Sequence, residues 1–159
     1  MLDASTTIYA MARYLKDRNN LRVVTNGIDV ARLLAENPSN TVILLGGVLR
    51  QDGASITGSL SEKILKDLHI GSAFVSCSGF SLVAGLTEID IHEAQLKEIA
   101  IKSSHQVFCL IDSTKFGRTD LTSFAELGQI THLYTDYLLS DEWREKLRAS
   151  KVSYTICEK

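Results

Sequence analysis

The sequence predicts a single α/β domain, built on a mainly parallel β-sheet with helices on both of its faces. Apolar, β-branched runs typical of strands alternate along the chain with segments whose apolar residues recur at helical spacing. Most of the strand-like runs end in small or polar residues. The chain has 159 residues, of which 45% are hydrophobic and 23% charged, so it can bury one substantial core.

The first half of the chain is expected to hold three strands and three helices. Residues 1–3 are expected to be the end of a strand whose beginning lies outside this chain. A helix capped by Ser5 or Thr6 follows, and its apolar stripe consists of Ile8, Met11, Ala12 and Leu15. Next come a strand at 21–25, a helix at 28–34, a strand at 41–45 and a helix at 59–68. The uninterrupted apolar run 41–45 predicts a strand buried on both faces, and the helical spacing predicts inward positions for Leu60, Ile64, Leu65 and Leu68.

The second half continues the alternation. Strands are expected at 73–75, 106–111, 130–135 and 152–156. One helix carries Glu93 and Lys97, and a later helix is expected to be capped by Asp141 and to extend to residue 148, with Trp143 and Leu147 inward. Residues 85–90 are predicted to form a polar loop, and residues 50–57 a polar segment containing glycine.

Composition and charge narrow the possible functions. The formal net charge is −2, so this chain lacks the basic excess needed to hold the phosphate backbone of DNA. No apolar run reaches the length of a membrane span and the N-terminus lacks the layout of a signal peptide, so we expect a cytoplasmic protein without membrane contact. Neither GxGxxG nor GxxxxGK[ST] occurs, and no cofactor is expected.

Metal binding and disulfides are not expected either. No CxxC, HxH or HExxH spacing occurs. The cysteines are expected to be buried, reduced thiols, and the histidines to be solvated or packed in the core. These residues are Cys77, Cys109 and Cys157, and His69, His92, His105 and His132.

The most informative stretch runs from Phe74 to Lys97. Its strand ends in Ser-Cys-Ser-Gly, and a loop with Thr87, Glu88 and Asp90 then leads into the helix of Glu93 and Lys97. Ligands of open α/β sheets bind just beyond the carboxyl ends of the strands, so a site is expected here. Alternatively, Glu93 and Lys97 form an ordinary surface ion pair, one helical turn apart.

Three other segments also have both a structural and a functional interpretation. Residues 5–7 are three hydroxyls that either cap a helix or cradle an anion at its first turn. Gly46 and Gly47 form either a simple turn or a place where the backbone approaches a ligand closely. Asp112 and Lys115 follow a strand. Either Asp112 binds sugar hydroxyls and Lys115 a phosphate, or both belong to a solvated turn closed by Gly117.

Five blocks of sequence, taken together and in order, give a more specific signal. They are LDASTT (2–7), VTNG (24–27), LLGGVLR (44–50), SGFSLVAGLTEIDIHEAQLK (78–97) and DSTKFGR (112–118). Together they cover most of the chain and resemble the sensor domain of DeoR-type transcriptional repressors. That resemblance implies a Rossmann-like fold shared with ribose-5-phosphate isomerase and glucosamine-6-phosphate deaminase, with a phosphorylated sugar held at the edge of the sheet.

The resemblance also implies that separate parts of the regulator bind the effector and the DNA. Residues 1–159 would be one effector-sensing domain, and operator DNA would be contacted only through a helix-turn-helix module that this chain lacks. By position, the effector-binding residues would be Asp3, Ser5, Thr6, Thr7, Asn26, Gly46, Gly47, Ser78, Gly79, Thr87, Glu93, Lys97, Asp112 and Lys115. Symmetric operators favour a homodimer or homotetramer, with Tyr137, Leu138 and Leu139 either at an interface or in the core.

The alternative is a sugar-phosphate isomerase or deaminase. Such an enzyme needs a carboxylate base and a cation near the developing oxyanion. Glu88, Asp90 or Glu93 would be the base, and Lys97 or Lys115 the cation. The spacing after Thr87 differs from that of the isomerase, so we assign no catalytic residue and expect a sensor that does not convert its ligand.

Overall fold

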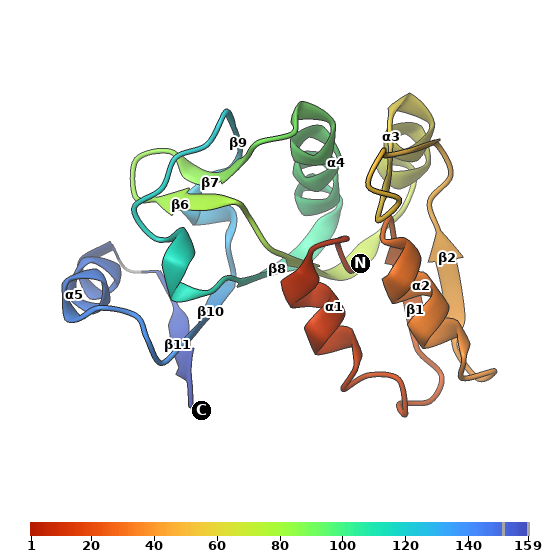
Figure 1. The fold of residues 1–159 in the computed structure, drawn as a ribbon, viewed down its shortest axis with the longest axis horizontal. Coiled ribbons are helices and arrows are strands. Elements are labelled where there is room, and N and C mark those ends of the chain that lie inside the picture. The colour runs from red at the N-terminus through yellow and green to blue at the C-terminus, as the bar shows by residue number, and fades with distance from the viewer. Residues whose placement is uncertain (151, 159) are drawn as a thin grey trace.

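The centre of the computed structural model, which describes residues 1–150 and 152–158, is a parallel β-sheet (Figure 1). Leu2 bridges Thr25 of one strand and Phe74 of another, both in parallel, so residues 1–3 lie in the middle of the sheet. The full order is β2 (Thr41–Leu44), β1 (Arg22–Thr25), residues 1–3, β5 (Ile70–Val75), β8 (Ser104–Leu110), β10 (His132–Asp136) and β11 (Tyr154–Cys157). Every pair is parallel, which confirms the predicted α/β class.

Helices cover both faces of this sheet. They are α1 (Thr6–Ala12), α2 (Ile28–Ala35), α3 (Ser59–Lys66), α4 (Ile91–Lys102) and α5 (Asp141–Ser150), with short 3₁₀ turns at η1 (Ser113–Lys115) and η2 (Leu127–Gln129). Val23 packs with α1 and α2, whereas Val24 packs with α3 and α4. Successive strand residues point to opposite faces, so the two helix pairs lie on opposite sides.

Two small antiparallel sheets are added to this core. The first is β6 (Gly79–Ser81), β7 (Gly85–Glu88) and β9 (Thr122–Ala125); the second is the hairpin of β3 (Val48–Leu49) and β4 (Ile56–Thr57). The prediction of a loop at residues 85–90 is therefore wrong for residues 85–88, which form β7. Such a short strand has no long apolar run by which the sequence could indicate it. Gly85 has φ +70°, and a Cβ there would lie 2.0 Å from the carbonyl oxygen of Ala125, so the pairing of β7 with β9 requires glycine.

The prediction that residues 41–45 are buried on both faces is wrong. Among the described residues β2 pairs only with β1 and forms an edge of the sheet, which leaves Ile43 and Leu44 exposed, while Leu45 beyond its end is fully buried. The inward position predicted for Leu60 is also wrong, because its side chain is 54% exposed next to this edge. The hydropathy of a run does not distinguish a covered strand from an apolar edge.

The C-terminal third differs from expectation in two details. Ser140, not Asp141, caps α5, because its Oγ accepts the amide of Trp143 at 3.4 Å and Asp141 is already helical. Trp143 and Leu147 face inward as predicted, with Trp143 against Phe80 and Phe116. Of the segment proposed as interface or core, Leu139 is buried, whereas Tyr137 and Leu138 are exposed.

The cysteines are free, as expected, but not all of them are buried. Cys77 and Cys109 lie in the core, whereas Cys157, in the edge strand β11, is exposed. Contact with the Cys77 thiol, together with burial, raises the pKa of Cys109 well above its usual value. Cys109 is therefore a neutral thiol at physiological pH.

Candidate functional site

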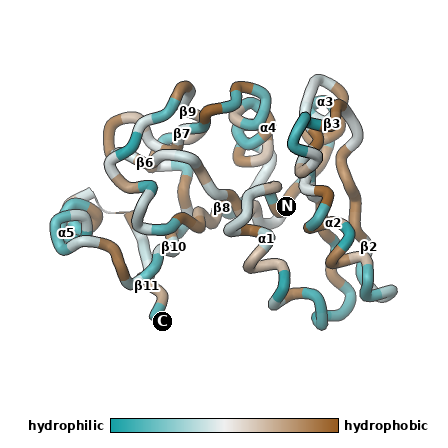
Figure 2. The backbone as a smooth tube through the Cα atoms, viewed as in Figure 1, coloured by the Kyte–Doolittle hydropathy of each residue, from teal (hydrophilic) through white to brown (hydrophobic). Residues whose placement is uncertain are grey.

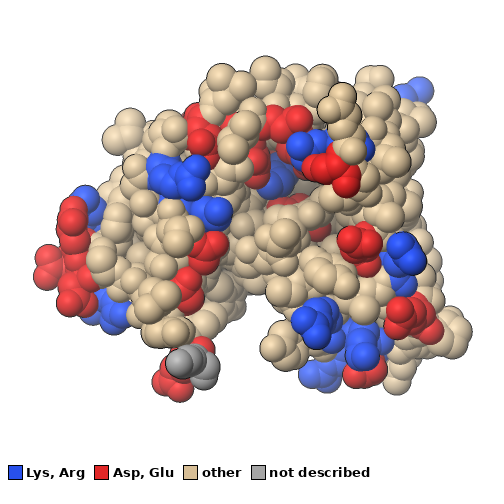
Figure 3. Space-filling view, viewed as in Figure 1, with Lys and Arg blue, Asp and Glu red and all other residues tan. Residues whose placement is uncertain are grey.

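A polar cavity of about 390 Å³ opens at the carboxyl ends of residues 1–3, β5 and β8, where the sequence predicted a site. Figure 3 looks into this hollow, in which positive and negative side chains lie close together. The lining residues come from segments far apart in the chain: Ala4, Ser5, Thr6, Thr7, Arg50, Asp52, Ala54, Ser55, Ser76, Cys77, Ser78, Glu88, Ile89, Glu93, Lys97, Asp112, Lys115 and Arg118.

Lys97 is a buried cation at the inner wall of the cavity, and only 5% of the residue is exposed. Its Nζ donates to the Ser76 carbonyl at 2.8 Å and to Glu88 at 2.5 Å, and it lies 3.3 Å from Asp3. Burial by itself lowers the pKa of Lys97, but the charges of Asp3 and Glu88 outweigh burial and hold the pKa above its ordinary value. Two of the three donors of this ammonium are thus hydrogen-bonded, and the carboxylates of Glu88 and Asp3 offset its charge.

Asp3 lies beneath the cavity and joins three elements. One carboxylate oxygen accepts the amide and the hydroxyl of Ser5, at 2.8 and 2.6 Å, and the other accepts the amide of Ser76 at 2.7 Å. Ser5 in turn caps α1 by accepting the amide of Ile8 at 3.2 Å. Asp3 thus fixes the ends of two strands and the start of α1 relative to Lys97.

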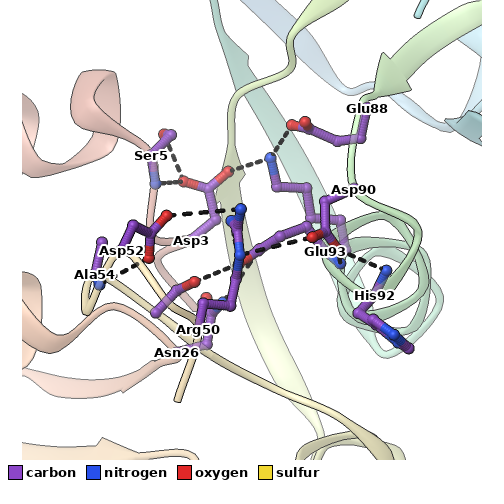
Figure 4. A network of polar contacts seen from close by, with 12 residues as sticks. Asp3, Ser5, Asn26, Arg50, Asp52, Ala54, Glu88, Asp90, His92 and Glu93 are labelled. Carbon is purple, nitrogen blue, oxygen red and sulfur yellow. Dashed lines mark hydrogen bonds and ion pairs between the residues drawn. The ribbon is translucent and has the colours of Figure 1, made fainter. Parts of the chain in front are cut away.

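Glu93, one turn before Lys97 on α4, forms a second buried network (Figure 4). It accepts the Ser55 hydroxyl at 2.5 Å, the Asn26 amide at 3.3 Å and the Arg50 guanidinium at 3.4 Å. Arg50 also lies 3.6 Å from both Asp52 and Asp90, the residue that caps α4. The β3–β4 hairpin and α4 are therefore joined across the cavity by charge.

Two cations at the rim beyond β8, Lys115 and Arg118, have fewer polar contacts than Lys97. Asp112 caps η1 by accepting the amide of Thr114 at 2.9 Å. Burial alone would raise the pKa of Asp112, but the hydrogen bonds from Thr114 and the charge of Lys115 lower it. Arg118 lies 3.9 Å from Asp120, and Lys115 has no ion pair within the described part of the chain. Lys115 is thus available to an incoming anion.

The structure brings most of the predicted site residues to the cavity. Eight of them line it: Ser5, Thr6, Thr7, Ser78, Glu93, Lys97, Asp112 and Lys115. Asp3 and Asn26 lie behind it, each in contact with a lining residue. Gly79 and Thr87 are joined by a hydrogen bond between β6 and β7, from the Thr87 hydroxyl to the Gly79 carbonyl at 3.0 Å.

Gly46 and Gly47 do not line the cavity. The Gly46 carbonyl accepts the hydroxyl of Ser61 at 2.6 Å. A Cβ on Gly47 would lie 2.4 Å from the carbonyl oxygen of Thr57, so the β3–β4 hairpin accounts for this glycine. Packing within the chain thus explains Gly47 without a ligand, whereas a Cβ on Gly46 would meet only Leu60, at an ordinary 3.7 Å.

Several lining residues were missed by the sequence analysis. Arg50 ends the block 44–50 and Ser55 follows it, but neither was assigned a role, and only the fold of the β3–β4 hairpin places them on Glu93. Glu88 was considered only as a catalytic base, but its carboxylate accepts from Lys97 and from Ser78. The charged, glycine-containing composition of 50–55 was the one signal available for this hairpin.

The hydroxyls of Ser5 and Thr6 have different expected roles, which substitution tests. Ser5→Ala removes the cap of α1 and one donor to Asp3, so we expect the free energy of unfolding to fall by about 1 kcal/mol. Thr6→Ala removes an exposed hydroxyl that has no hydrogen bond in the described chain, so the free energy of unfolding should change by less than about 0.5 kcal/mol. Urea unfolding of both variants decides this; equal losses would contradict the assignment of Ser5 as the cap.

A second cavity, of about 570 Å³, lies at the opposite ends of the strands. Apolar side chains dominate its lining, among them Met1, Leu15, Leu21, Val23 and Leu68. This chemistry offers few groups that could hold an anion, so the two cavities suit different ligands.

Neither metal binding nor a transmembrane helix has support in the described residues. Across residues 1–150 and 152–158, no three side chains of His, Cys, Asp or Glu are placed to share a metal ion. Within the same ranges, none of the helices has the length and apolar character required to span a bilayer.

A polar, charged cavity at the carboxyl ends of parallel strands is the feature expected of an α/β domain that binds a small ligand. The family model described as the DeoR C terminal sensor domain matches residues 1–137. The chain therefore belongs to this family of sensor domains, as the five sequence blocks indicated.

Curated relatives cover nearly the whole chain. It is 31% identical to the HTH-type transcriptional regulator GolR of Listeria innocua over 99% of this chain and 62% of the relative. It is 31% identical to the glycerol-3-phosphate regulon repressor of Escherichia coli (85% and 54%) and 34% identical to the L-fucose operon activator of Haemophilus influenzae (88% and 56%). The chain thus spans a little over half the length of these relatives. Their names agree with the expectation of a regulatory domain rather than an enzyme.

Proposed function

We propose that the polar cavity binds a phosphorylated carbohydrate, and that this binding controls operator DNA binding by a helix-turn-helix module of the complete regulator. The observation that carries the proposal is the arrangement of charge. A cation without an ion pair in the described chain, Lys115, lies at the rim with Arg118, whereas the carboxylates of Glu88 and Glu93 lie deeper. A phosphate needs cations such as those at the rim, and sugar hydroxyls need acceptors such as the deeper carboxylates.

The phosphate is assigned to the rim between η1 and the start of α1. Lys115 and Arg118 supply positive charge, and the Thr6 and Thr7 hydroxyls, which have no hydrogen bond in the described chain, add donors. Lys97 is not assigned this role, because its Nζ donates to Ser76 and Glu88 on the inner wall and its charge is paired with Glu88 and Asp3. Lys97 therefore positions the carboxylates, and the rim cations contact the anion.

The carbohydrate is assigned to the inner wall. A carboxylate has about four acceptor positions, so Glu88 and Glu93 keep free lone pairs beyond the donors they already hold. Asp112 adds a further ionised acceptor at the rim. The cavity volume of about 390 Å³ is within the usual range for small-molecule sites.

The names of two relatives support a phosphorylated or carbohydrate-linked effector. One is a glycerol-3-phosphate regulon repressor and another an L-fucose operon activator. A regulator responds to its effector only if the effector binds the operator-bound and the released arrangement of the regulator with different affinity. The β3–β4 hairpin, which lines the cavity and is joined to Glu93 by Arg50, is one element that such a ligand would contact.

Thermal unfolding against matched pairs of ligands tests this function. Each phosphorylated sugar or polyol is compared with its unphosphorylated parent and with inorganic phosphate. A true ligand at 100 times its dissociation constant adds about 2.7 kcal/mol, which raises the melting temperature by roughly 5–10 °C for a domain of this size. NMR of the ligand after incubation should show it unchanged. Equal shifts with phosphorylated and parent compounds, or no shift with either, would contradict the proposal.

A further inference from the structure

The two cations assigned to the phosphate lie on one short loop. We define the rim loop as residues 112–118, which follow β8 and contain the 3₁₀ turn η1. Lys115 has no ion pair among the described residues, and Arg118 lies 3.9 Å from Asp120. The place of these two charges therefore depends on how the backbone of the rim loop is held.

Hydrogen bonds tie the rim loop to two neighbouring strands. Near its start, the amide of Ser113 donates to the carboxylate of Asp136, in β10, at 3.0 Å. Near its end, the amide of Gly117 donates to the carbonyl of Phe80, in β6, at 2.8 Å. The backbone of the loop is thus attached on each side of Lys115.

Aromatic packing supports the second of these attachments. The ring of Phe116 is buried and packs edge-to-face against Phe80 and Trp143, with centroid distances of 5.0 and 5.3 Å. The indole of Trp143 also lies against the backbone of Gly117, because a Cβ on that glycine would be 3.5 Å from Cζ2 of the ring. Trp143 therefore contacts two consecutive residues of the rim loop, directly between its two cations.

Trp143 belongs to a helix that has few other apolar contacts. Figure 2 shows α5 as a mainly hydrophilic helix; Leu147 is buried and Trp143 half-buried, whereas most of its other residues are exposed. The Nζ of Lys146 lies 4.8 Å from the centre of the indole, on the same helix. The family model matches residues 1–137, so α5 lies outside the matched region. The support of the rim loop thus comes from a part of the chain that the family match does not include.

We propose that Trp143 is a positioning residue for the anion site. Its indole, packed against Phe116 and Gly117, holds the rim loop in the conformation that places Lys115 and Arg118 at the cavity. A loop that must become ordered during binding loses affinity, so a loop that is already held binds its anion more tightly. The identity of the anion as a phosphate group rests on the proposed function, whereas the ordering of the loop by Trp143 does not.

Amide hydrogen exchange tests the ordering without any ligand. In Trp143→Leu, we expect the amide of Gly117 to exchange about tenfold faster or more, because its hydrogen bond to Phe80 loses the aromatic support. Trp143→Phe keeps an aromatic ring and should retain most of the protection. Unchanged exchange of Gly117 in Trp143→Leu would overturn the proposal, whatever ligand the cavity binds.

The matched control is Leu147→Ala, on the same helix. Leu147 is fully buried, so this variant should lower the melting temperature of the domain at least as much as Trp143→Leu. It leaves the indole in place, and the exchange of Gly117 should stay close to that of the wild type. Equal acceleration in both variants would show that Trp143 contributes only to overall stability, and would overturn its role as a positioning residue.

Inorganic phosphate then tests the link to the anion site. Trp143 is the one tryptophan of the chain, so its emission reports directly on the support of the rim loop. In the wild type, we expect a saturable change of this emission with sodium phosphate at neutral pH, and none with sodium chloride at equal ionic strength. Followed by the NMR shift of the Lys115 amide, the dissociation constant for phosphate should rise about tenfold in Trp143→Leu and stay unchanged in Leu147→Ala.

The possible failures are distinguishable. If phosphate shifted the Lys115 amide with the same affinity in wild type and Trp143→Leu, the positioning role would be overturned and the proposed function would stand. If neither phosphate nor any phosphorylated sugar shifted that amide in the wild type, the proposed function would be contradicted. The exchange of Gly117 would still decide whether Trp143 orders the rim loop.

Discussion

Lys97→Met is expected to lower the free energy of unfolding by about 3–5 kcal/mol, because it leaves the carboxylates of Asp3 and Glu88 buried without a cation. Methionine keeps most of the side-chain volume, so the loss reports on charge rather than on a cavity. Because the pKa of Lys97 is raised, its stabilisation is fully present below its unfolded pKa of about 10.4 and is lost only at more alkaline pH. The difference should therefore persist at neutral pH. Urea unfolding measures it.

The matched control is Lys102→Met, on the same helix. Lys102 forms an exposed pair with Glu98 at 2.5 Å, and such surface pairs contribute about 0–1 kcal/mol. If Lys97→Met unfolded at the same urea concentration as Lys102→Met, the buried network of Asp3, Glu88 and Lys97 would not stabilise the domain as we describe.

Lys115→Met is expected to weaken binding of the phosphorylated ligand about 10- to 100-fold while leaving the free energy of unfolding nearly unchanged. Loss of a charge-assisted hydrogen bond costs about 1.5–3 kcal/mol, and each 1.4 kcal/mol is a tenfold change in affinity. Lys115 makes no ion pair in the described chain, so the unliganded fold does not depend on it. Titration calorimetry gives the affinity.

The control for Lys115 is Lys63→Met, which removes an exposed lysine from α3, outside the cavity. It changes the net charge equally and should leave the affinity unchanged. Affinity for the unphosphorylated parent should be equally weak in wild type and Lys115→Met. Equal effects of Lys63→Met and Lys115→Met would show that only overall charge matters, and would contradict a phosphate site at the rim.

Much of the fold could be predicted from the sequence, because apolar runs and helical stripes report directly on local structure. The parallel strands and the packing of Trp143 and Leu147 follow from these patterns. The exposure of Ile43 and Leu44 does not, because it depends on which strands lie beside β2. The short strand β7 was also missed, since its pairing with β9 is decided by the close approach at Gly85.

The candidate site was predictable in its position but not in its roles. Polar residues at strand ends must gather at one edge of a parallel sheet, which is why Ser5, Ser78 and Lys115 meet there. Whether a lysine is free or engaged depends on contacts between distant segments. The sequence could not show that Lys97 is held by Asp3, or that Arg50 reaches Glu93.

The most direct test of the proposed binding site is an amide-resolved NMR titration of this chain with the phosphorylated compound that stabilises it most. We predict the largest shift changes at Thr6, Thr7, Lys115 and Arg118, with little change at Leu21 or Leu68 in the apolar cavity. The unphosphorylated parent should give a much weaker response at the same rim residues. Changes centred on Leu21 and Leu68, with the rim unaffected, would contradict the assignment of the polar cavity as the effector site.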